Sequence, residues 1–273
     1  MKKLISLMLT LAMLAAVIPA ALTRVSAEDA TPKGNWTDDG NFDLSWCKTL
    51  DSKTSETLEL NGKYYHIMAW TNQTYHITNA KQLAGLAYLS NLASGDIFKG
   101  DKFMIEENLD LSAHYWIPIC QTENKSKFRG SLLGNVNGGA ATITGMTIDT
   151  SDKPNVYSGL IGQFGGDWIE NLRLENAAIT ANSYYVGSFV AWQNSNVGSG
   201  LVYGKREGGY RNLYADTRIV LTSGRSDKRD DVGGIVGYIS NCTNVNDPTT
   251  VITKCVFTGT ITAPNADTVG GIL

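Results

Sequence analysis

The sequence predicts an all-β fold, a solenoid in which the chain winds into stacked coils, because two short patterns recur along it. The first pattern is a four-residue unit of small, apolar, apolar and small residues, here named the GLIG unit. It occurs at residues 159–162, 188–191 and 234–237 and, cut short, at 271–273, with steps of 29, 46 and 37 residues. Self-similarity at such intervals is typical of stacked units that bury their apolar faces against one another.

A second pattern travels with the GLIG unit and places apolar residues at positions i, i+3 and i+5. Its copies are Ile169, Leu172 and Leu174; Tyr210, Leu213 and Ala215; Ile252, Cys255 and Phe257; and, upstream, Ile143, Met146 and Ile148. We expect each copy to contribute to one shared apolar interior.

The composition agrees with a solenoid and narrows the class of partner. Charged residues make up 18% of the chain and glycine accounts for 28 of 273 residues, which suits short strands and tight turns. The first 27 residues contain three basic residues and no acid, so the remainder holds 20 basic and 26 acidic residues, a net charge of −6. This balance argues against nucleic acid or an anionic membrane as the partner.

Residues 1–27 have the pattern of a secretory signal peptide. Lys2-Lys3 precede an apolar run from Leu4 to Leu22, which Pro19 interrupts, and Val25-Ser26-Ala27 form a small-residue cleavage site. The alternative is an uncleaved membrane anchor, since the apolar run approaches spanning length. Cleavage predicts a secreted or cell-surface protein with no membrane insertion.

Residues 28–74 are expected to form a linker and a β-hairpin, in which strands 58–60 and 64–70 flank Asn61-Gly62. The segment is rich in aromatic residues: Trp36, Trp46, Tyr64, Tyr65 and Trp70. We expect these rings to pack a small core or plug the end of the solenoid, and the alternative is a sugar-stacking face.

Residues 75–95 are assigned to a capping helix. The helix is expected over 78–93, with Thr78 or Asn79 as N-cap, leucines at three-residue steps from Leu83 to Leu92, and Gly95 as C-cap. The solenoid is assigned to 96–273. Because the last GLIG unit is cut short at Leu273, we expect the solenoid to be incomplete at its C-terminus.

The repeats resemble the GLUG repeat of secreted and surface-attached bacterial proteins. The resemblance rests on the GLIG units and the strand after each, and covers roughly residues 75–273. Upstream, three segments resemble the lead-in to such repeats: residues 75–87, residues 108–119, and residues 128–135 together with 143–146. The resemblance to the GLUG repeat implies a right-handed parallel β-helix-like solenoid, but it implies no particular reaction. GLUG repeats also occur upstream of the catalytic part of immunoglobulin A1-specific metallopeptidases, so this chain could be a front end of that kind.

Four cysteines, Cys47, Cys120, Cys242 and Cys255, follow the signal segment. An even number in an exported chain suggests disulfides, with three pairings open. A bridge between Cys242 and Cys255 is one option, and a small buried side chain is the other reading of Cys255. The cysteine and histidine spacings indicate no metal site and no cofactor.

The carboxylates do not recur in register as a glycan-cleaving groove would require. The candidate acids are Asp167, Glu170, Glu175, Asp216, Asp230 and Asp231. The histidines His66, His76 and His114 form no zinc motif. Asp110 and Ser112 are expected to be turn residues, and a calcium site at Glu106, Glu107 and Asp110 lacks a dense acidic loop.

The sequence therefore predicts a non-catalytic scaffold or adhesin-like binding module without catalytic, cofactor-binding or metal residues. Expected partners are a host glycan, a matrix protein or a cell-wall polysaccharide. The alternatives are a carbohydrate-active β-helix enzyme and the non-catalytic front end of a larger secreted metallopeptidase.

Overall fold

The computed structural model describes residues 32–68, 71–122, 126–194, 208–222, 230–240 and 250–273. The chain divides into two compact units, residues 1–31 and 32–273, and the described residues belong to the second. The predicted signal peptide, Trp70 and Cys242 lie outside the described residues.

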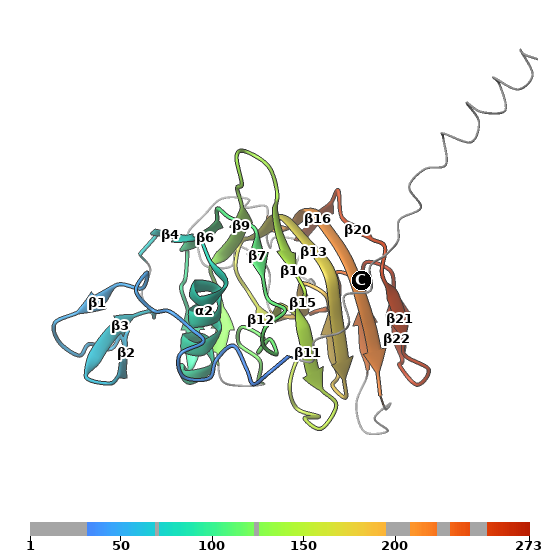
Figure 1. Cartoon of the computed structure of the whole chain (residues 1–273), viewed down its shortest axis with the longest axis horizontal. Coiled ribbons are helices and arrows are strands. Elements are labelled where there is room, and N and C mark those ends of the chain that lie inside the picture. Colours follow the sequence, from blue (N-terminus) through green and yellow to red (C-terminus); the bar gives the residue numbers. More distant parts are fainter. Residues whose placement is uncertain (1–31, 69–70, 123–125, 195–207, 223–229, 241–249) are drawn as a thin grey trace, which may run out of the picture. The chain divides into compact units, whose positions relative to one another are not determined.

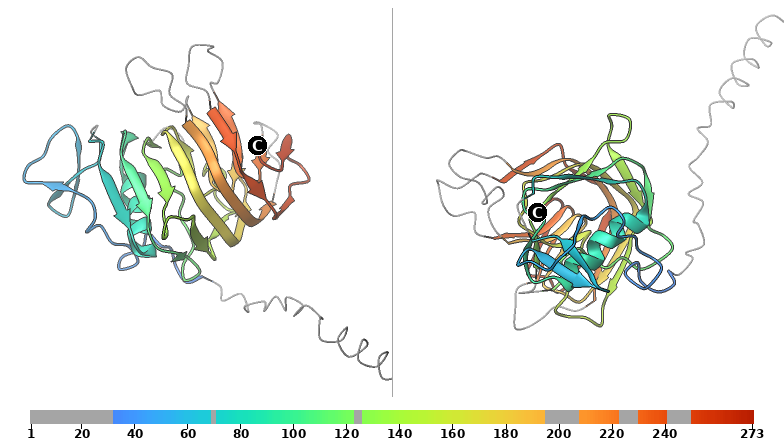
Figure 2. Two further views of the ribbon diagram at one scale, coloured as in Figure 1. Left: turned by 90° about the horizontal axis from the view of Figure 1, so that it is seen from above. Right: turned by 90° about the vertical axis from the view of Figure 1, so that its left-hand side faces the viewer.

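The second unit is a column of stacked coils, which confirms the predicted β-solenoid. Strands that are tens of residues apart in the sequence pair in parallel, one coil after the next. Seen from the side, the strands lie in line from β6 to β21, and seen from the end, successive coils share one outline (Figures 1 and 2). Among the described residues, no helix is long and apolar enough to cross a bilayer.

The strands of the described residues fall into four sheets. The longest sheet follows the path β19 (Thr250–Thr253), β16 (Gly208–Leu221), β13 (Trp168–Ala181), β9 (Ser131–Gly134), β6 (Lys102–Ile105) and β4 (Thr74–Ile77). Beside it pair β7 (Leu109–Asp110), β10 (Ala141–Thr144), β11 (Thr147–Thr150), β20 (Val256–Phe257) and β21 (Thr260–Thr262). A second sheet runs β18 (Val236–Ser240), β15 (Val190–Asn194), β12 (Ile161–Phe164), β8 (Ser126–Phe128) and β5 (Gly95–Ile97). A third contains β14 (Tyr185–Gly187), β17 (Asp231–Gly233) and β22 (Thr268–Gly270), and the fourth contains β1 (Thr49–Leu50), β3 (Lys63–His66) and β2 (Thr57–Leu60).

The copies of the GLIG unit lie on successive coils. Ile161 pairs with Val190, and Val190 pairs with Val236. The backbone N–H of Ile161 donates to the carbonyl oxygen of Phe189 at 2.8 Å, and that of Val236 donates to Ile272 at 2.9 Å. The recurrence seen in the sequence is therefore a recurrence of position in the coil.

The second pattern aligns in the same way over the later coils. Ile169 stands beside Tyr210, which stands beside Ile252. The predicted upstream copy, residues 143–148, is out of register, since Ile143 pairs with Leu174 and not with Ile169. The coil from β9 to β11 makes a turn in which Val136 and Gly139 bond each other, whereas β13 continues without one. Residues 143–148 therefore have the same spacing of apolar residues as the other copies, but they lie in a different part of the coil.

Small residues of the GLIG unit allow neighbouring coils to approach closely. A Cβ atom added to Gly162 would lie 2.5 Å from the carbonyl oxygen of Cys120, and one added to Gly234 would lie 2.1 Å from that of Gly271. The left-handed corners use other residues: Asn171, Asn212 and Lys254 have φ of 55°, 52° and 54°. At these positions, the main role of glycine is to allow close contact between coils, and bending of the chain is a lesser role.

Aromatic rings line the interior of the column from coil to coil. The ring centroids of Phe103 and Phe128 are 5.5 Å apart, those of Phe128 and Phe164 are 6.3 Å apart, and those of Phe164 and Tyr210 are 6.0 Å apart. These side chains are fully buried, so one aromatic series contributes apolar contact along four coils.

The aromatic residues of the N-terminal segment pack mainly as a plug. Trp46 lies against Tyr75 and Phe103, with ring centroids 5.2 and 5.5 Å apart. Trp36 is buried, and its indole N–H donates to the carbonyl oxygen of Leu111 at 3.0 Å. Tyr65, on β3, is also buried. These contacts favour the interpretation that the N-terminal aromatic residues pack a core or plug, over the alternative that they form a sugar-stacking face.

Strands β2 and β3 form a hairpin whose two-residue turn is Asn61-Gly62. Both turn residues have positive φ, 49° and 74°, as a type I′ turn requires. Strand β3 ends at His66, earlier than the predicted end at residue 70.

Helix α2 (Ala80–Leu92) belongs to the first coil, between β4 and β5. Asn79 is the N-cap and accepts the backbone N–H of Gln82 at 3.0 Å. The predicted C-cap is wrong: Ala93 caps the helix, and Gly95, with φ of 94°, opens β5. The column also begins before residue 96, because β4 already pairs in parallel with β6.

Candidate functional site

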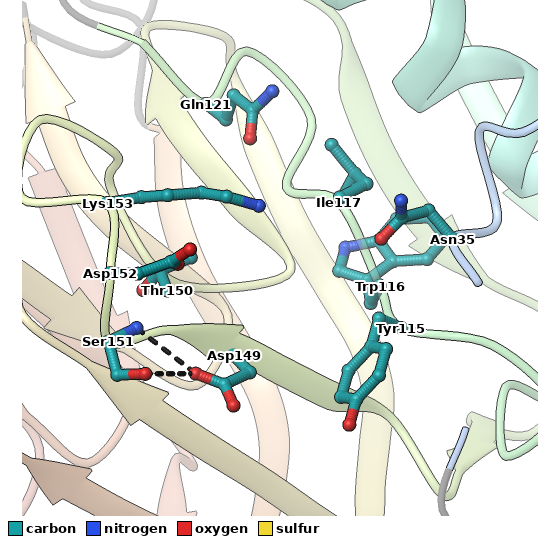
Figure 3. Close-up of a pocket in the computed structure, with 10 residues that line it drawn as sticks. All are labelled: Asn35, Tyr115, Trp116, Ile117, Gln121, Asp149, Thr150, Ser151, Asp152 and Lys153. Atoms are coloured by element: carbon teal, nitrogen blue, oxygen red, sulfur yellow. Dashed lines mark hydrogen bonds between the residues drawn. The ribbon is translucent and has the colours of Figure 1, made fainter. Parts of the chain in front are cut away.

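A pocket of about 440 Å³ opens on the flank of the column. One wall is the segment Tyr115–Ile117, between β7 and β8, with Asn35 beside it and Gln121 nearby. The other wall is Asp149–Lys153, the end of β11 and the turn that follows (Figure 3). The lining thus combines aromatic surface with two carboxylates, an ammonium and two amides.

Hydrogen bonds within the turn fix the second wall. The Asp149 carboxylate accepts the backbone N–H of Ser151 at 3.1 Å and its hydroxyl at 2.7 Å. The backbone N–H of Lys153 donates to Thr150 at 2.9 Å. The exposed Lys153 side chain extends across the pocket towards Ile117 (Figure 3). Its ammonium is therefore placed to meet a molecule that enters the pocket.

Five aromatic residues pack beside this pocket, in a cluster distinct from the interior of the column. We name Tyr157, Tyr184, Tyr185, Trp192 and Tyr238 the aromatic cluster. Tyr157 and Tyr184 are buried, whereas Tyr185, Trp192 and Tyr238 are half-buried. The cluster therefore has a buried base and a partly accessible surface.

Strand pairing positions the accessible rings. Trp192 on β15 stands beside Tyr238 on β18, so both side chains project from the same face of the sheet. The ring of Tyr185 stacks on that of Tyr238, with centroids 4.8 Å apart and planes 10° apart. The indole N–H of Trp192 donates to the Ser240 hydroxyl at 3.0 Å, which fixes the orientation of the ring.

One hydrogen bond joins the aromatic cluster to the pocket, and a second joins it to the segment that follows the pocket wall. The backbone N–H of Tyr157 donates to the carbonyl oxygen of Gln121, a pocket residue, at 2.8 Å. The Tyr184 hydroxyl donates to Asn155, two residues beyond Lys153, at 3.3 Å. Pocket and cluster are therefore adjacent parts of one flank.

Sequence reasoning missed this flank, although a signal was present. Each cluster residue lies close to a copy of the GLIG unit: Tyr157, Tyr184 and Tyr185 shortly before a unit, and Trp192 and Tyr238 directly after one. Because the copies stack, residues at these positions had to meet on neighbouring coils.

The acids considered for catalysis are spread over several strands. Asp231 adjoins the aromatic cluster, since it pairs with Tyr185 and its backbone N–H donates to the carbonyl oxygen of Tyr184 at 2.7 Å. Glu170 on β13 pairs with Arg211 on β16 at 2.6 Å, and Arg211 also lies 4.6 Å from the ring of Trp168. Glu175 pairs with Arg173 at 2.9 Å on β13. Glu170 and Glu175 thus already have arginine partners.

The remaining acids are distributed as follows. Asp167 precedes β13, Asp216 is on β16, and Asp230 and Asp231, both buried, stand at the start of β17. The backbone N–H of Asp230 donates to the Asp267 carboxylate at 3.0 Å. Asp230 and Asp231 thus belong to the packing of the third sheet.

The histidines occupy three separate places. His66 lies 3.0 Å from Glu56, and His76 lies 2.8 Å from Glu106. His114 meets the ring of Trp36 edge-on, with centroids 4.8 Å apart. Within the described residues, no group of three His, Cys, Asp or Glu side chains could hold a metal ion.

The acids considered for calcium have local roles. Glu106 is the partner of His76, and the Asp110 carboxylate accepts the backbone N–H of Ser112 at 2.9 Å, as expected of a turn residue. Glu107 lies in the loop between β6 and β7.

No two of the described cysteines, Cys47, Cys120 and Cys255, form a disulfide with each other. Burial is the main cause that raises the pKa of Cys47 and that of Cys120, each to about 12. Burial also raises the pKa of Cys255, whose thiol lies 3.4 Å from the carbonyl oxygen of Thr253. Its candidate partner, Cys242, lies outside the described residues, so the bridge stays a prediction.

Comparison with known proteins gives one distant likeness. The chain is 26% identical over 169 residues to halomucin of Haloquadratum walsbyi, which is a large, repetitive surface glycoprotein. The match covers 58% of this chain and 2% of halomucin. No family model and no solved structure matches the chain. The comparisons thus connect this chain, partially and distantly, with a surface protein built from repeats.

Proposed function

We propose that this chain is an exported, GLUG-type repeat protein that acts at a bacterial surface or in the medium as a non-catalytic scaffold or adhesin-like binding module. The observation that carries the proposal is the flank: accessible aromatic rings beside a polar pocket, on a column held by in-register coils. Such a surface can hold a partner without using a cofactor. The partner class is a host glycan, a matrix protein or a cell-wall polysaccharide.

Three further observations support this proposal. The GLIG units occupy equivalent positions in successive coils, as in a repeat protein. The distant relative is a surface glycoprotein. Residues 1–27 have the pattern of a cleavable secretory signal.

The arrangement of acids favours binding over glycan cleavage. Glycoside hydrolysis needs two carboxylates on opposite sides of the scissile bond. In the pocket, Asp149 and Asp152 belong to one turn, and Asp149 already accepts two hydrogen bonds from Ser151. The Glu170 and Glu175 side chains pair with arginines on the longest sheet.

Export and binding can be tested on the full chain produced in a bacterial host. We expect N-terminal sequencing of the exported protein to begin at Glu28, and we expect binding to an immobilised glycan or to a matrix protein without release of reducing ends from polysaccharides. An exported product that still begins at Met1 would contradict cleavage. Steady polysaccharide turnover would replace the binding module by a carbohydrate-active enzyme.

A further inference from the structure

The aromatic cluster has the properties of a surface built for stacking. The half-buried rings of Tyr185, Trp192 and Tyr238 remain accessible in part, while Tyr157 and Tyr184 support them from beneath. The Tyr157 ring lies 5.3 Å from that of Trp192 and 5.7 Å from that of Tyr185. Packing on both sides restricts the rings before any ligand arrives, which lowers the entropic cost of binding.

The pocket supplies the polar half of such a site. Asp152 and Lys153 are exposed at its rim, and Gln121 and Asn35 add amide groups that both donate and accept. Its volume of about 440 Å³ is within the usual range for small-ligand sites. A ligand with many hydroxyl groups could bond donors and acceptors here at the same time.

The mixed lining favours a sugar over a protein segment. The centre of a protein–protein interface is depleted in lysine and aspartate, whereas this pocket carries Asp149, Asp152 and Lys153 in one turn. A sugar ring has an apolar face that covers an aromatic ring and hydroxyl groups at its edge that bond charged side chains. The pocket and the aromatic cluster come from neighbouring segments, because the backbone N–H of Tyr157 donates to the carbonyl oxygen of Gln121, a pocket residue.

We propose that the pocket and the aromatic cluster together form one binding site for a neutral oligosaccharide. The rings of Tyr185, Trp192 and Tyr238 stack on the apolar faces of the sugar units, and the side chains of Asp152 and Lys153 bind hydroxyl groups. This inference rests on the proposed binding function and adds its ligand class and its residues. Shape and hydroxyl pattern, more than charge, select the ligand.

The test is calorimetric titration of the full chain with neutral hexasaccharides: cellohexaose, xylohexaose, mannohexaose and chitohexaose. We expect at least one to bind, with a dissociation constant that changes little with salt because the ligand carries no charge. Trp192→Ala should weaken this binding about fivefold or more, and Trp192→Phe should stay within about twofold of the original chain because the ring is kept. Lys153→Ala, at an exposed position, should weaken binding about tenfold.

The matched control is Trp168→Ala, which removes an aromatic ring on the longest sheet, where Trp168 lies 4.6 Å from Arg211. We expect it to bind like the original chain. Equal loss in Trp168→Ala and Trp192→Ala, unchanged binding in Lys153→Ala, or no binding of any hexasaccharide at millimolar concentration would overturn the site. If one of those results is obtained and the chain still binds a matrix protein, the proposed binding module is retained, with a protein as its partner.

Discussion

Inward apolar side chains of the column meet their counterparts on the coils before and after. Leu172, fully buried on β13, stands in register between Ala141 and Leu213. A residue at such a position has no path to water, so any charge placed there would lack both solvent and a partner.

We therefore expect Leu172→Asp to lower the free energy of unfolding by about 3 kcal/mol or more. Arg218→Asp, at an exposed position on β16, should change it by less than about 0.5 kcal/mol. Urea unfolding followed by circular dichroism measures both values. Equal midpoints for the two variants would contradict a closed apolar interior at Leu172.

The buried carboxyl group of Asp101 makes the stability of the fold depend on pH. Asp101, only 1% exposed, accepts the Thr71 hydroxyl at 2.6 Å and the backbone N–H of Gln73 at 2.9 Å. Burial raises the pKa of its carboxyl group, and the two hydrogen bonds oppose that rise in part. The folded chain therefore holds this proton more firmly than the unfolded chain, so the stabilisation is complete at low pH and is lost as the pH rises through the folded pKa.

In Asp101→Asn the side-chain oxygen can still accept both hydrogen bonds, but no charge is buried. We expect the stability of this variant relative to the original chain to improve as the pH rises from about 4 to about 7. Urea unfolding at both pH values measures the change, and Asp152→Asn, at an exposed acid, controls for the loss of one charge. A relative stability that does not vary with pH would show that the Asp101 pKa is not raised.

At the scale of the element, stacked corners keep successive strands in register. Asn171 and Asn212 both adopt left-handed φ, and the Asn212 amide donates to the Asn171 side-chain oxygen at 2.9 Å. Lys254 continues the corner on the next coil with φ of 54°. Asparagine tolerates this conformation better than a β-branched residue does.

Asn212→Val should thus cost more stability than Asn212→Gly, by about 1–2 kcal/mol. Both variants remove the hydrogen bond to Asn171, so the difference between their melting temperatures does not depend on that bond. Arg218→Val, at an exposed position within the same strand, should be tolerated. Identical melting for the two Asn212 variants would mean that the corner does not hold its left-handed conformation in solution.

The elements also show how far local patterns predict structure. The N-cap of α2 and the turn at Asn61-Gly62 followed from side-chain chemistry within a few residues. The C-cap did not, because Gly95 adopts positive φ for the start of β5 and not for the helix end. A glycine near a helix terminus satisfies either requirement, and the sequence alone does not distinguish them.

At the scale of the whole molecule, recurrence predicted the stacking of coils but not their lengths. The positions of the GLIG units were sufficient to align the later coils, since equivalent residues must share the apolar interior. The predicted register of residues 143–148 was wrong because the turn at Val136–Gly139 changes the path of one coil. The candidate site was missed because Tyr157, Trp192 and Tyr238 are tens of residues apart in the sequence and come together only through the stacking of the GLIG units beside them.

The parallel register has a mechanical consequence. Hydrogen bonds between coils run along the axis of the column, across the strands, so tension applied along that axis loads one interface at a time. One coil, such as that from Ile169 to its partner Tyr210, spans 41 residues and would release about 140 Å of chain when it peels away. Optical-tweezer pulling on terminal tags should record a staircase of such lengths, and a single rupture of the whole column would contradict it. Under load, the molecule would yield gradually and absorb work.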